Sequence, residues 1–301
     1  MNIIQKVIRE IKAELDEKVF KQDEAKNALS YALGLHLFKT KMPEEHNRQI
    51  KKTNVLLMGP TGVGKTLLAS QLKGIGFDVF KMSARDITDE GIAGLSISDY
   101  LKMFLNELEG DIDRLEKSII FVDEFDKITG PYALKGGGDH NRITQELLLK
   151  FIEGHEYRVN LKGGVVDTKN IMFVICGNFE AVRQRRKAAE KPTMGFVDNS
   201  EISLKPIHEE LQDIGLMAEL AGRISLVAEL ESLTKDDLMS ILLTVDDNIL
   251  DQYKALFNSV EVELPLTKED LETIVEGCVK NKTGARGLQT ELDKLLYRRL
   301  L

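Results

Sequence analysis

The sequence of 301 residues contains no tryptophan, and it has only two cysteines and five histidines. Cys176 and Cys278 are too few for a disulfide framework, and neither they nor the histidines have the spacing of zinc ligands. No apolar run approaches the roughly eighteen residues that span a bilayer, and charge interrupts the N-terminal segment too early for a signal peptide. These absences predict a protein of a reducing compartment, the cytoplasm, without a membrane partner.

Basic residues are also fewer than acidic residues. Asp and Glu number 49 against 41 Lys and Arg, which gives a net charge of −8. This balance argues against a protein whose main task is to bind a nucleic-acid backbone. The exception is the run Arg-Gln-Arg-Arg-Lys at 183–187. We interpret it as a solvated helix face, with contact to nucleic acid or to an acidic partner as the alternative.

The strongest motif is the segment 59–66, Gly-Pro-Thr-Gly-Val-Gly-Lys-Thr, which fits G-x-x-x-x-G-K-[ST]. An apolar run precedes it and a helical pattern follows it, which is the context that confirms this motif. Glycines let backbone N–H groups approach phosphates, Lys65 reaches the β- and γ-phosphates, and the Thr66 hydroxyl takes Mg²⁺. The sequence therefore predicts a nucleoside triphosphate with Mg²⁺. The predicted contact residues are Gly59, Pro60, Thr61, Gly62, Val63, Gly64, Lys65, Thr66 and Leu67.

A second motif supplies the partner that a phosphate loop needs. The apolar run 119–122 ends in two carboxylates, Asp123 and Glu124. We expect Asp123 to hold Mg²⁺, usually through water, and Glu124 to orient and deprotonate the attacking water. The Asp-Glu pair favours ATP hydrolysis by a motor over a GTPase switch.

The chain alternates short apolar strands with helices from residue 55 onward. The expected strands are 55–58, 119–122 and 171–176, with a further one at 224–229. This order predicts a parallel sheet covered by helices. Helical spacing of apolar residues is found over 3–38, and we expect a loop at 41–53 and a tight hairpin at 157–166.

The part of the chain after Glu231 carries only helical patterns. Thr234 and Thr267, each followed by an acidic first turn, look like helix N-caps. We therefore expect two domains: a large α/β ATPase domain at 1–231, including the N-terminal helices, and a small all-helical domain at 232–301.

Together these motifs resemble the Clp-type AAA+ ATPases, and the ClpX-like unfoldase subunits most of all. The similarity extends over the whole chain, because further segments match the family in order. These are 19–26 on the adenine side, 147–154 after the second motif, 215–223 around the arginine finger and 284–288 at sensor 2. The resemblance implies an AAA+ P-loop domain with a helical lid, ATP and Mg²⁺ as ligands, and a homo-hexamer with ATP between its subunits.

The resemblance also implies roles for individual residues. Val19 and Phe20 would contact the adenine, Arg223 would reach the γ-phosphate of the neighbouring subunit, and Arg286 would reach the nucleotide of its own subunit. A guanidinium suits this task because charge builds on the equatorial oxygens during phosphoryl transfer. For sensor 1, Asn178 is the natural polar candidate, while an alignment through the following Phe favours Cys176 or Gly177.

The sequence departs from the family at three places. Lys21 stands where the family usually has Gly. The pore loop, an aromatic flanked by glycines in ClpX-like unfoldases, reads Gly-Ile-Ala-Gly at 91–94, so Ile92 replaces the aromatic. Met194-Gly195-Phe196 lies where the family carries a hydrophobic tripeptide that docks into a peptidase ring. An ordinary loop with Phe196 packed on the core is the alternative.

The resulting prediction is a hexameric ring ATPase that remodels or unfolds a polypeptide. A second hypothesis is a specialised AAA+ switch that acts on one dedicated partner assembly without processive translocation. A third is a nucleic-acid-associated AAA+ protein. Ile92 favours the second over a broad unfoldase, since an aliphatic side chain offers less contact area and no flat face. The net acidity disfavours the third.

Overall fold

The computed structural model describes residues 2–47, 50–88, 94–130, 139–159, 164–190, 205–245 and 248–301. In chain order, the structure begins with the helices and strands α1 (Ile3–Lys18), α2 (Asp23–Lys41), α3 (Glu44–Asn47), β1 (Val55–Met58), α4 (Lys65–Gly74), β2 (Val79–Ser83) and the 3-10 helix η1 (Ala84–Asp86). It continues with α5 (Ile97–Glu107), α6 (Ile112–Glu116), β3 (Ile119–Asp123), η2 (Phe125–Ile128), α7 (His140–Glu153), β4 (Glu156–Arg158), β5 (Val165–Asp167) and η3 (Thr168–Asn170). It ends with β6 (Met172–Gly177), α8 (Glu180–Glu190), α9 (Ile207–Asp213), α10 (Ala218–Ala221), β7 (Leu226–Glu229), α11 (Lys235–Thr244), α12 (Ile249–Asn258), α13 (Lys268–Lys280), η4 (Gly284–Arg286) and α14 (Gly287–Leu300).

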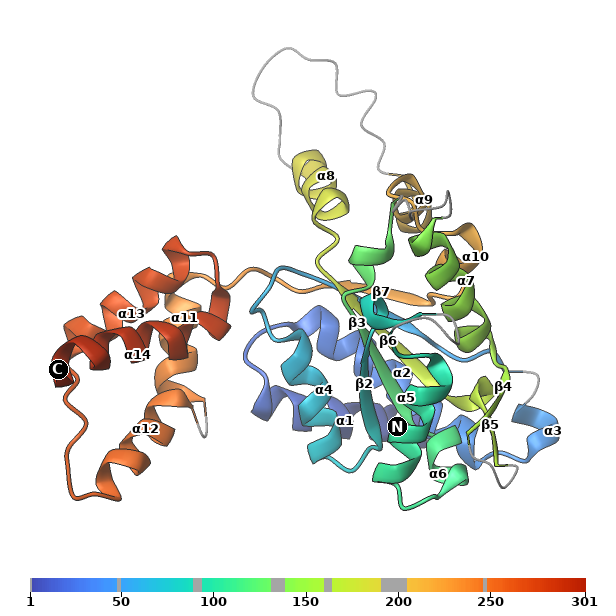
Figure 1. Cartoon of the computed structure of the whole chain (residues 1–301), viewed down its shortest axis with the longest axis horizontal. Coiled ribbons are helices and arrows are strands. Elements are labelled where there is room, and N and C mark those ends of the chain that lie inside the picture. Colours follow the sequence, from blue (N-terminus) through green and yellow to red (C-terminus); the bar gives the residue numbers. More distant parts are fainter. Residues whose placement is uncertain are drawn as a thin grey trace, which may run out of the picture.

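Five parallel strands form one sheet in the order β2-β3-β6-β1-β7. Strand β1 lies between β6 and β7, with Val55 opposite Val174 and Leu226. Side chains alternate between the two faces of each strand. One face packs against α1, α2 and α4, and the other against α5, α6, α7, α9 and α10 (Figure 1). The predicted parallel sheet covered by helices is confirmed.

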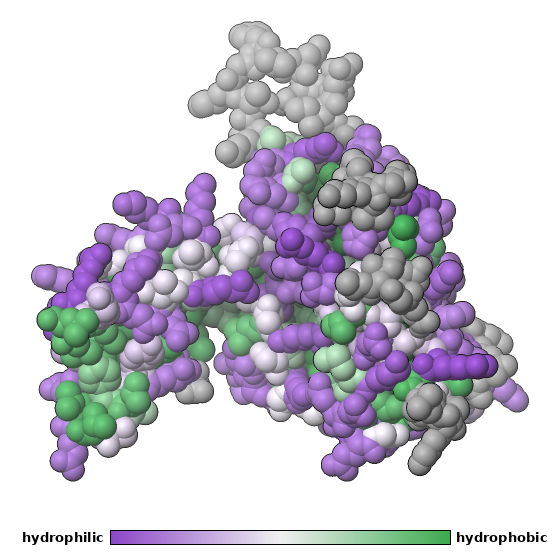
Figure 2. Space-filling view, in the orientation of Figure 1, coloured by the Kyte–Doolittle hydropathy of each residue, from purple (hydrophilic) through white to green (hydrophobic). Residues whose placement is uncertain are grey.

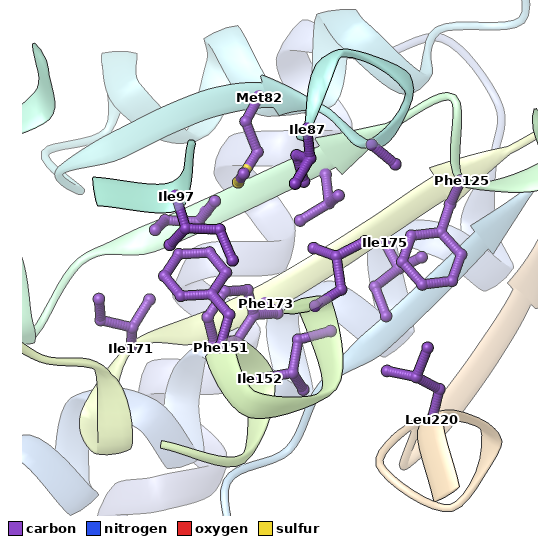
Figure 3. Packing of buried hydrophobic residues seen from close by; sticks show 14 of the residues in the cluster. Met82, Ile87, Ile97, Phe125, Phe151, Ile152, Ile171, Phe173, Ile175 and Leu220 are labelled. Carbon is purple, nitrogen blue, oxygen red and sulfur yellow. The ribbon is translucent and has the colours of Figure 1, made fainter. Parts of the chain in front are cut away.

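The second of these faces holds an aromatic core. Phe151 of α7 meets Phe173 of β6 edge to face, with ring centroids 4.9 Å apart. Ile152 and Ile175 lie beside them (Figure 3). A buried side chain of this size contributes roughly 1.5–3 kcal/mol by leaving water. This packing fixes α7 against β6, and β6 ends at Gly177 in the candidate site.

Two sequence expectations were incomplete. Strand β2 (Val79–Ser83) was missed, because the exposed Lys81 interrupts its apolar run. The segment 41–53 is not all loop, since it contains the short helix α3. The hairpin is confirmed, with β4 and β5 pairing antiparallel. The strand expected at 224–229 is also confirmed and begins two residues later.

The C-terminal helices α11–α14 have a core of their own, built around Leu238, Ile274 and Leu292. They lie to one side of the α/β part and are joined to it by the segment after β7 (Figure 1). Thr234 and Thr267 cap α11 and α13 with complete capping boxes, as expected. We propose the domain boundary between residues 231 and 232. Among the described residues, no helix is long and apolar enough to cross a membrane.

Candidate active site

The glycine loop connects the end of β1 to the start of α4. Gly62 and Gly64 have positive φ angles of 78° and 107°, a conformation that glycine adopts without steric cost. Gly64 is the N-cap of α4 and supplies no side-chain cap. The amides of the first turn of α4 therefore remain available to an anion.

Lys65 is the first residue of α4, and its side chain curls back over the loop. Its Nζ donates hydrogen bonds of 2.6 Å and 2.7 Å to the carbonyl oxygens of Gly59 and Pro60. Burial lowers the pKa of Lys65, and the nearby charges of Asp123 and Asp126 oppose that shift. The ammonium group is thus placed inside the loop and beside the carboxylates at the end of β3.

A cavity of about 330 Å³ joins the two sequence motifs to the C-terminal helical part α11–α14, which we call the lid. It is lined by Thr61, Gly62, Gly64, Lys65, Thr66, Leu67, Asp123, Glu124, Asp126, Lys127, Gly177, Asn178, Ala285 and Arg286. Gly59, Pro60 and Val63, which were also expected to contact the nucleotide, do not line it. The structure therefore brings most of the expected site residues to one place.

The carboxylates lie where β3 ends. Glu124 has a left-handed backbone, with φ 56°, which is uncommon outside glycine and is often found at functional sites. Its Oε2 accepts a hydrogen bond of 3.4 Å from the hydroxyl of Ser83, at the end of the neighbouring strand β2. Asp123 Oδ1 accepts from the Glu124 amide at 2.8 Å. Sequence reasoning missed Ser83, because the strand that places it was not recognised.

Thr66 and Asp123 line the same cavity, and their oxygens are the kind of ligand that Mg²⁺ prefers. Among the described residues no group of three or more His, Cys, Asp or Glu side chains forms a metal site. A magnesium ion bound mainly by nucleotide phosphates, with one or two protein oxygens, fits this donor set.

Asn178 follows β6 and lines the cavity. Its Oδ1 accepts a hydrogen bond of 3.0 Å from Arg183, whose Nε is bound to Glu229 Oε1 at 2.9 Å. A guanidinium can only donate, so the Asn178 amide nitrogen is left as a donor. Of the two alternatives for sensor 1, Gly177 offers no side chain, and Cys176 is buried beneath the loop, where burial raises its thiol pKa.

In the basic run 183–187, Gln184, Arg185 and Lys187 are exposed, as the sequence suggested, but the other two residues are not. Arg183 is only 6% exposed and is bound to Asn178 and Glu229. Arg186 pairs with the buried Glu210 at 2.6 Å. The sequence pattern gave no sign of this, because Glu229 and Glu210 lie on other elements of the fold.

The segment 19–26, which was expected on the adenine side, is hydrogen-bonded to the glycine loop through Gln22. Its residues do not line the cavity. Val19 is buried in the core, and neither it nor Phe20 is part of the cavity wall. Gln22, which the sequence did not single out, donates from Nε2 to the carbonyls of Val63 and Glu231 at 3.1 Å each. Its Oε1 accepts from the Glu231 amide at 2.8 Å. One side chain thus joins this segment, the loop and the start of the lid.

Lys21, which stands in the place of a family glycine, has a positive φ of 55°. A glycine adopts that conformation at no steric cost, whereas for a lysine the same conformation is strained. In this chain the Lys21 Nζ forms an ion pair of 2.7 Å with Asp237, whose carboxylate completes the capping box of α11. The replacement thus adds a link between the large domain and the lid.

Arg223 lies away from this cavity. Its guanidinium binds Glu153 Oε1, with Nε at 2.9 Å, and it lines a different cavity on the side of the sheet where β1 begins. The structure thus does not bring Arg223 to the phosphate loop of its own chain. Ile92 and Met194-Gly195-Phe196 lie outside the described residues.

Comparison with known proteins agrees with this geometry. A family model described as "AAA domain (Cdc48 subfamily)" matches residues 50–227. The "ATP-dependent Clp protease ATP-binding subunit ClpX 2" of Wolinella succinogenes is 35% identical over 96% of this chain and 75% of that protein. The chain belongs to the ClpX family of AAA+ ATPases. Two relatives named "ATP-dependent Clp protease ATP-binding subunit ClpX", from Treponema denticola and Borrelia duttonii, are 34% and 33% identical over 96% of this chain and cover 75% and 72% of their own lengths.

The ClpX-family membership shows that the chain is an ATPase of the Clp type. The expected fold and the expected family are both confirmed. The roles of single residues stay predictions, supported by the cavity that joins the loop, the carboxylates and the lid.

Proposed function

We propose that this protein hydrolyses ATP between adjacent copies of a homo-hexameric ring and uses the hydrolysis to remodel or unfold a polypeptide. One observation carries the proposal. The cavity contains the phosphate loop, both carboxylates and Arg286 of the lid, whereas Arg223 lies at another cavity. The cavity of one chain does not contain its own Arg223, and the Arg223 guanidinium of a neighbouring copy can complete the site.

Five residues of the cavity have a definite task in this proposal. Lys65 donates to the β- and γ-phosphates, and Glu124 orients the attacking water and accepts its proton. Asn178 donates to the γ-phosphate or to that water. Mg²⁺, held by Thr66 and through water by Asp123, would neutralise charge on the phosphate oxygens.

The lid supplies the mechanical coupling. Its segment around Arg286 meets the glycine loop directly, and Gln22 and Lys21 join the base of the lid to the adenine side. A change in nucleotide therefore reaches α11–α14 through bonded contacts.

The lid also carries apolar surface that supports assembly. Leu256, Val260 and Leu300 are each at least 60% exposed. Figure 2 shows hydrophobic surface gathered toward the free end of the helical domain. Exposed apolar patches of this kind mark protein contacts, and we assign this one to ring formation.

The relatives are named as subunits of a Clp protease. We therefore propose a polypeptide substrate and a peptidase ring as a further partner, docked through Met194-Gly195-Phe196. We place the protein in the cytoplasm, the reducing compartment that its two free cysteines favour. A dedicated protein partner in place of many substrates is the alternative that Ile92 favours.

The test is the ATP-dependent loss of fluorescence from a tagged green fluorescent reporter, with and without a peptidase ring. We expect ATP-driven unfolding that the Lys65→Ala variant lacks. ATP hydrolysis without unfolding of any tagged reporter would favour the dedicated switch. Absence of ATP hydrolysis would overturn the proposed function altogether.

A further inference from the structure

A second cavity, of about 650 Å³, lies on the side of the sheet where β1 begins. Its walls come from α2, the segment before β1, the end of α7 and the segment 167–169, together with Arg223. Lys39, Lys52 and Lys169 all line it. None of these three lysines belongs to the phosphate-loop cavity, and no motif of the sequence singled them out.

Lys39 is the most unusual of the three. It is only 7% exposed, and its ammonium group has no hydrogen-bond or ion-pair partner among the described residues. Burial lowers the pKa of Lys39, and the charge of Lys169 lowers it further. Lys39 Nζ is not among the buried polar atoms that lack a partner, so solvent reaches this ammonium group and its three donors are available to a ligand in the cavity.

Lys52 lines the same cavity. Its Nζ donates a hydrogen bond of 2.9 Å to the carbonyl of Thr168 and lies 4.8 Å from the centroid of the Phe173 ring. Burial lowers the pKa of Lys52 to about 7, and the positive charge of Lys39 contributes. Two of its three N–H groups remain to donate.

The carboxylates of the cavity neutralise only part of this positive charge. Glu153 is bound to Arg223, and Asp167 Oδ1 accepts from the backbone amide of Lys169. Glu156 is exposed at the rim. Five basic side chains, with Lys51 and Arg223 included, face three carboxylates. The cavity is therefore a positively charged site with donors to spare.

We propose that this cavity binds the phosphate groups of a polyphosphate ligand. Ammonium groups bind phosphate as point charges, and Arg223 adds a guanidinium that can donate two parallel hydrogen bonds to phosphate oxygens. A carboxylate has only two oxygens and one charge, which is too little for three lysines. The volume is that of a small-molecule site.

The phosphates can come from two sources. One is the ATP of a neighbouring copy, because Arg223 lines this cavity; this case rests on the proposed function. The other is a free polyphosphate or nucleotide that binds without a neighbour. Both supply the same chemistry, and the experiment separates them.

The experiment measures how fast a limiting amine-reactive ester modifies Lys39, Lys52 and Lys169, by peptide mass spectrometry. The probes are inorganic tripolyphosphate and ATP with Mg²⁺, each compared with potassium chloride of equal ionic strength. Lys41, exposed on the same helix and outside the cavity, is the internal control. Protection of the three cavity lysines but not of Lys41 supports the proposal.

The Lys65→Ala variant identifies the source, since it cannot hold ATP in the phosphate loop. Protection by ATP that persists in this variant shows a free ligand, and protection that disappears shows the neighbour's nucleotide. The protection readout does not require hydrolysis, so a failed ATPase assay and a failed phosphate site are distinguishable. No protection by either probe, in either protein, would overturn the proposal.

A matched pair of variants tests the cavity itself. Lys39→Gln removes one charge-assisted contact, so half-protection should require about tenfold more tripolyphosphate. Lys41→Gln should change nothing, and Lys39→Arg should restore protection of Lys169. If tripolyphosphate protects Lys169 equally well in Lys39→Gln and in Lys41→Gln, the cavity is not the phosphate site.

Discussion

The backbone amide of Ala285 donates a hydrogen bond of 2.9 Å to the carbonyl oxygen of Gly62. The segment that carries Arg286 is therefore bound directly to the glycine loop. A Cβ on Gly284 would lie 2.6 Å from the same carbonyl oxygen, and one on Gly62 would lie 2.1 Å from the carbonyl of Thr283. Two glycines thus allow two backbones to meet at the nucleotide cavity.

Gly284→Ala should separate the lid from the loop, because the added methyl group meets backbone and not a flexible side chain. We expect ATP turnover to fall on the order of 10²-fold, as for other displacements of about 1 Å at an active site. Steady-state ATPase assays at saturating ATP measure this loss.

Gly76→Ala is the matched control for that change. Gly76 also has a positive φ, 97°, but its Cβ would meet no atom within 4 Å. Both substitutions carry backbone strain of about 1–2 kcal/mol, so both should lower the unfolding temperature. Equal loss of ATPase activity in the two variants would show that strain, and not lid contact, is the cause.

Local patterns were sufficient for the strands and motifs that lie together in the sequence. The loop at 59–66 and the carboxylates after β3 are each contiguous, so the sequence placed them correctly. Lys81 concealed β2, and with it Ser83, which contacts Glu124 from 41 residues away. Burial of Arg183 depends on Glu229, and the role of Gln22 depends on Glu231, 209 residues away. Such contacts require the tertiary fold.

Glu124→Gln should leave ATP binding nearly intact and lower turnover by about two to four orders of magnitude, as expected for loss of a general base. The amide keeps the shape of the side chain and can still contact Ser83. Nucleotide binding by equilibrium dialysis and phosphate release give the two quantities. Turnover at the wild-type rate would remove Glu124 from the role of base. Glu107→Gln, on the exposed face of α5, serves as the control.

Arg223→Ala should abolish hydrolysis although each copy still binds nucleotide, because this side chain lies away from its own cavity. Mixing it with Lys65→Ala protein should restore part of the activity. In a mixed ring, the intact pocket of one copy meets the intact Arg223 of the other.

Arg286→Ala mixed with Lys65→Ala is the matched control for that experiment. Arg286 lines the cavity of its own chain, so every pocket of this mixed ring carries one defect. We expect no recovery. Recovery in both mixtures, or in neither, would contradict the assignment of Arg223 to the neighbouring site.

His36 predicts a loss of stability in acid. Burial lowers the pKa of its imidazole to about 4, although the hydrogen bond with the Lys117 carbonyl opposes this, and the charges of Lys39 and Lys52 act with burial. Between pH 6.5 and about 4, His36 is protonated in the unfolded chain and neutral in the folded chain. Stability therefore falls as the pH is lowered through this window, by up to about 3 kcal/mol.

His36→Gln keeps a donor for the Lys117 carbonyl but cannot titrate. Denaturant unfolding of both proteins at pH 7 and pH 4.5, at one protein concentration, measures the difference. Carboxylates that titrate in the same range affect both proteins alike. The contribution of His36 is therefore the difference between the two proteins in the unfolding free energy lost from pH 7 to pH 4.5. A variant that loses as much stability as the wild type would show that His36 does not control this part of the acid response.

Ile92→Tyr separates a translocating ring from a dedicated switch. This residue lies outside the described residues, so the prediction rests on its place between Gly91 and Gly94 in the family's pore loop. A tyrosine ring adds contact area and a flat face, and aromatic contacts contribute about 0.5–1.5 kcal/mol beyond area. In a translocating unfoldase the variant should unfold the tagged reporter about two- to tenfold faster, whereas Ile92→Leu should not. If Ile92→Tyr leaves unfolding unchanged while ATP turnover is normal, the loop does not pull on polypeptide, and the protein acts on one dedicated partner instead.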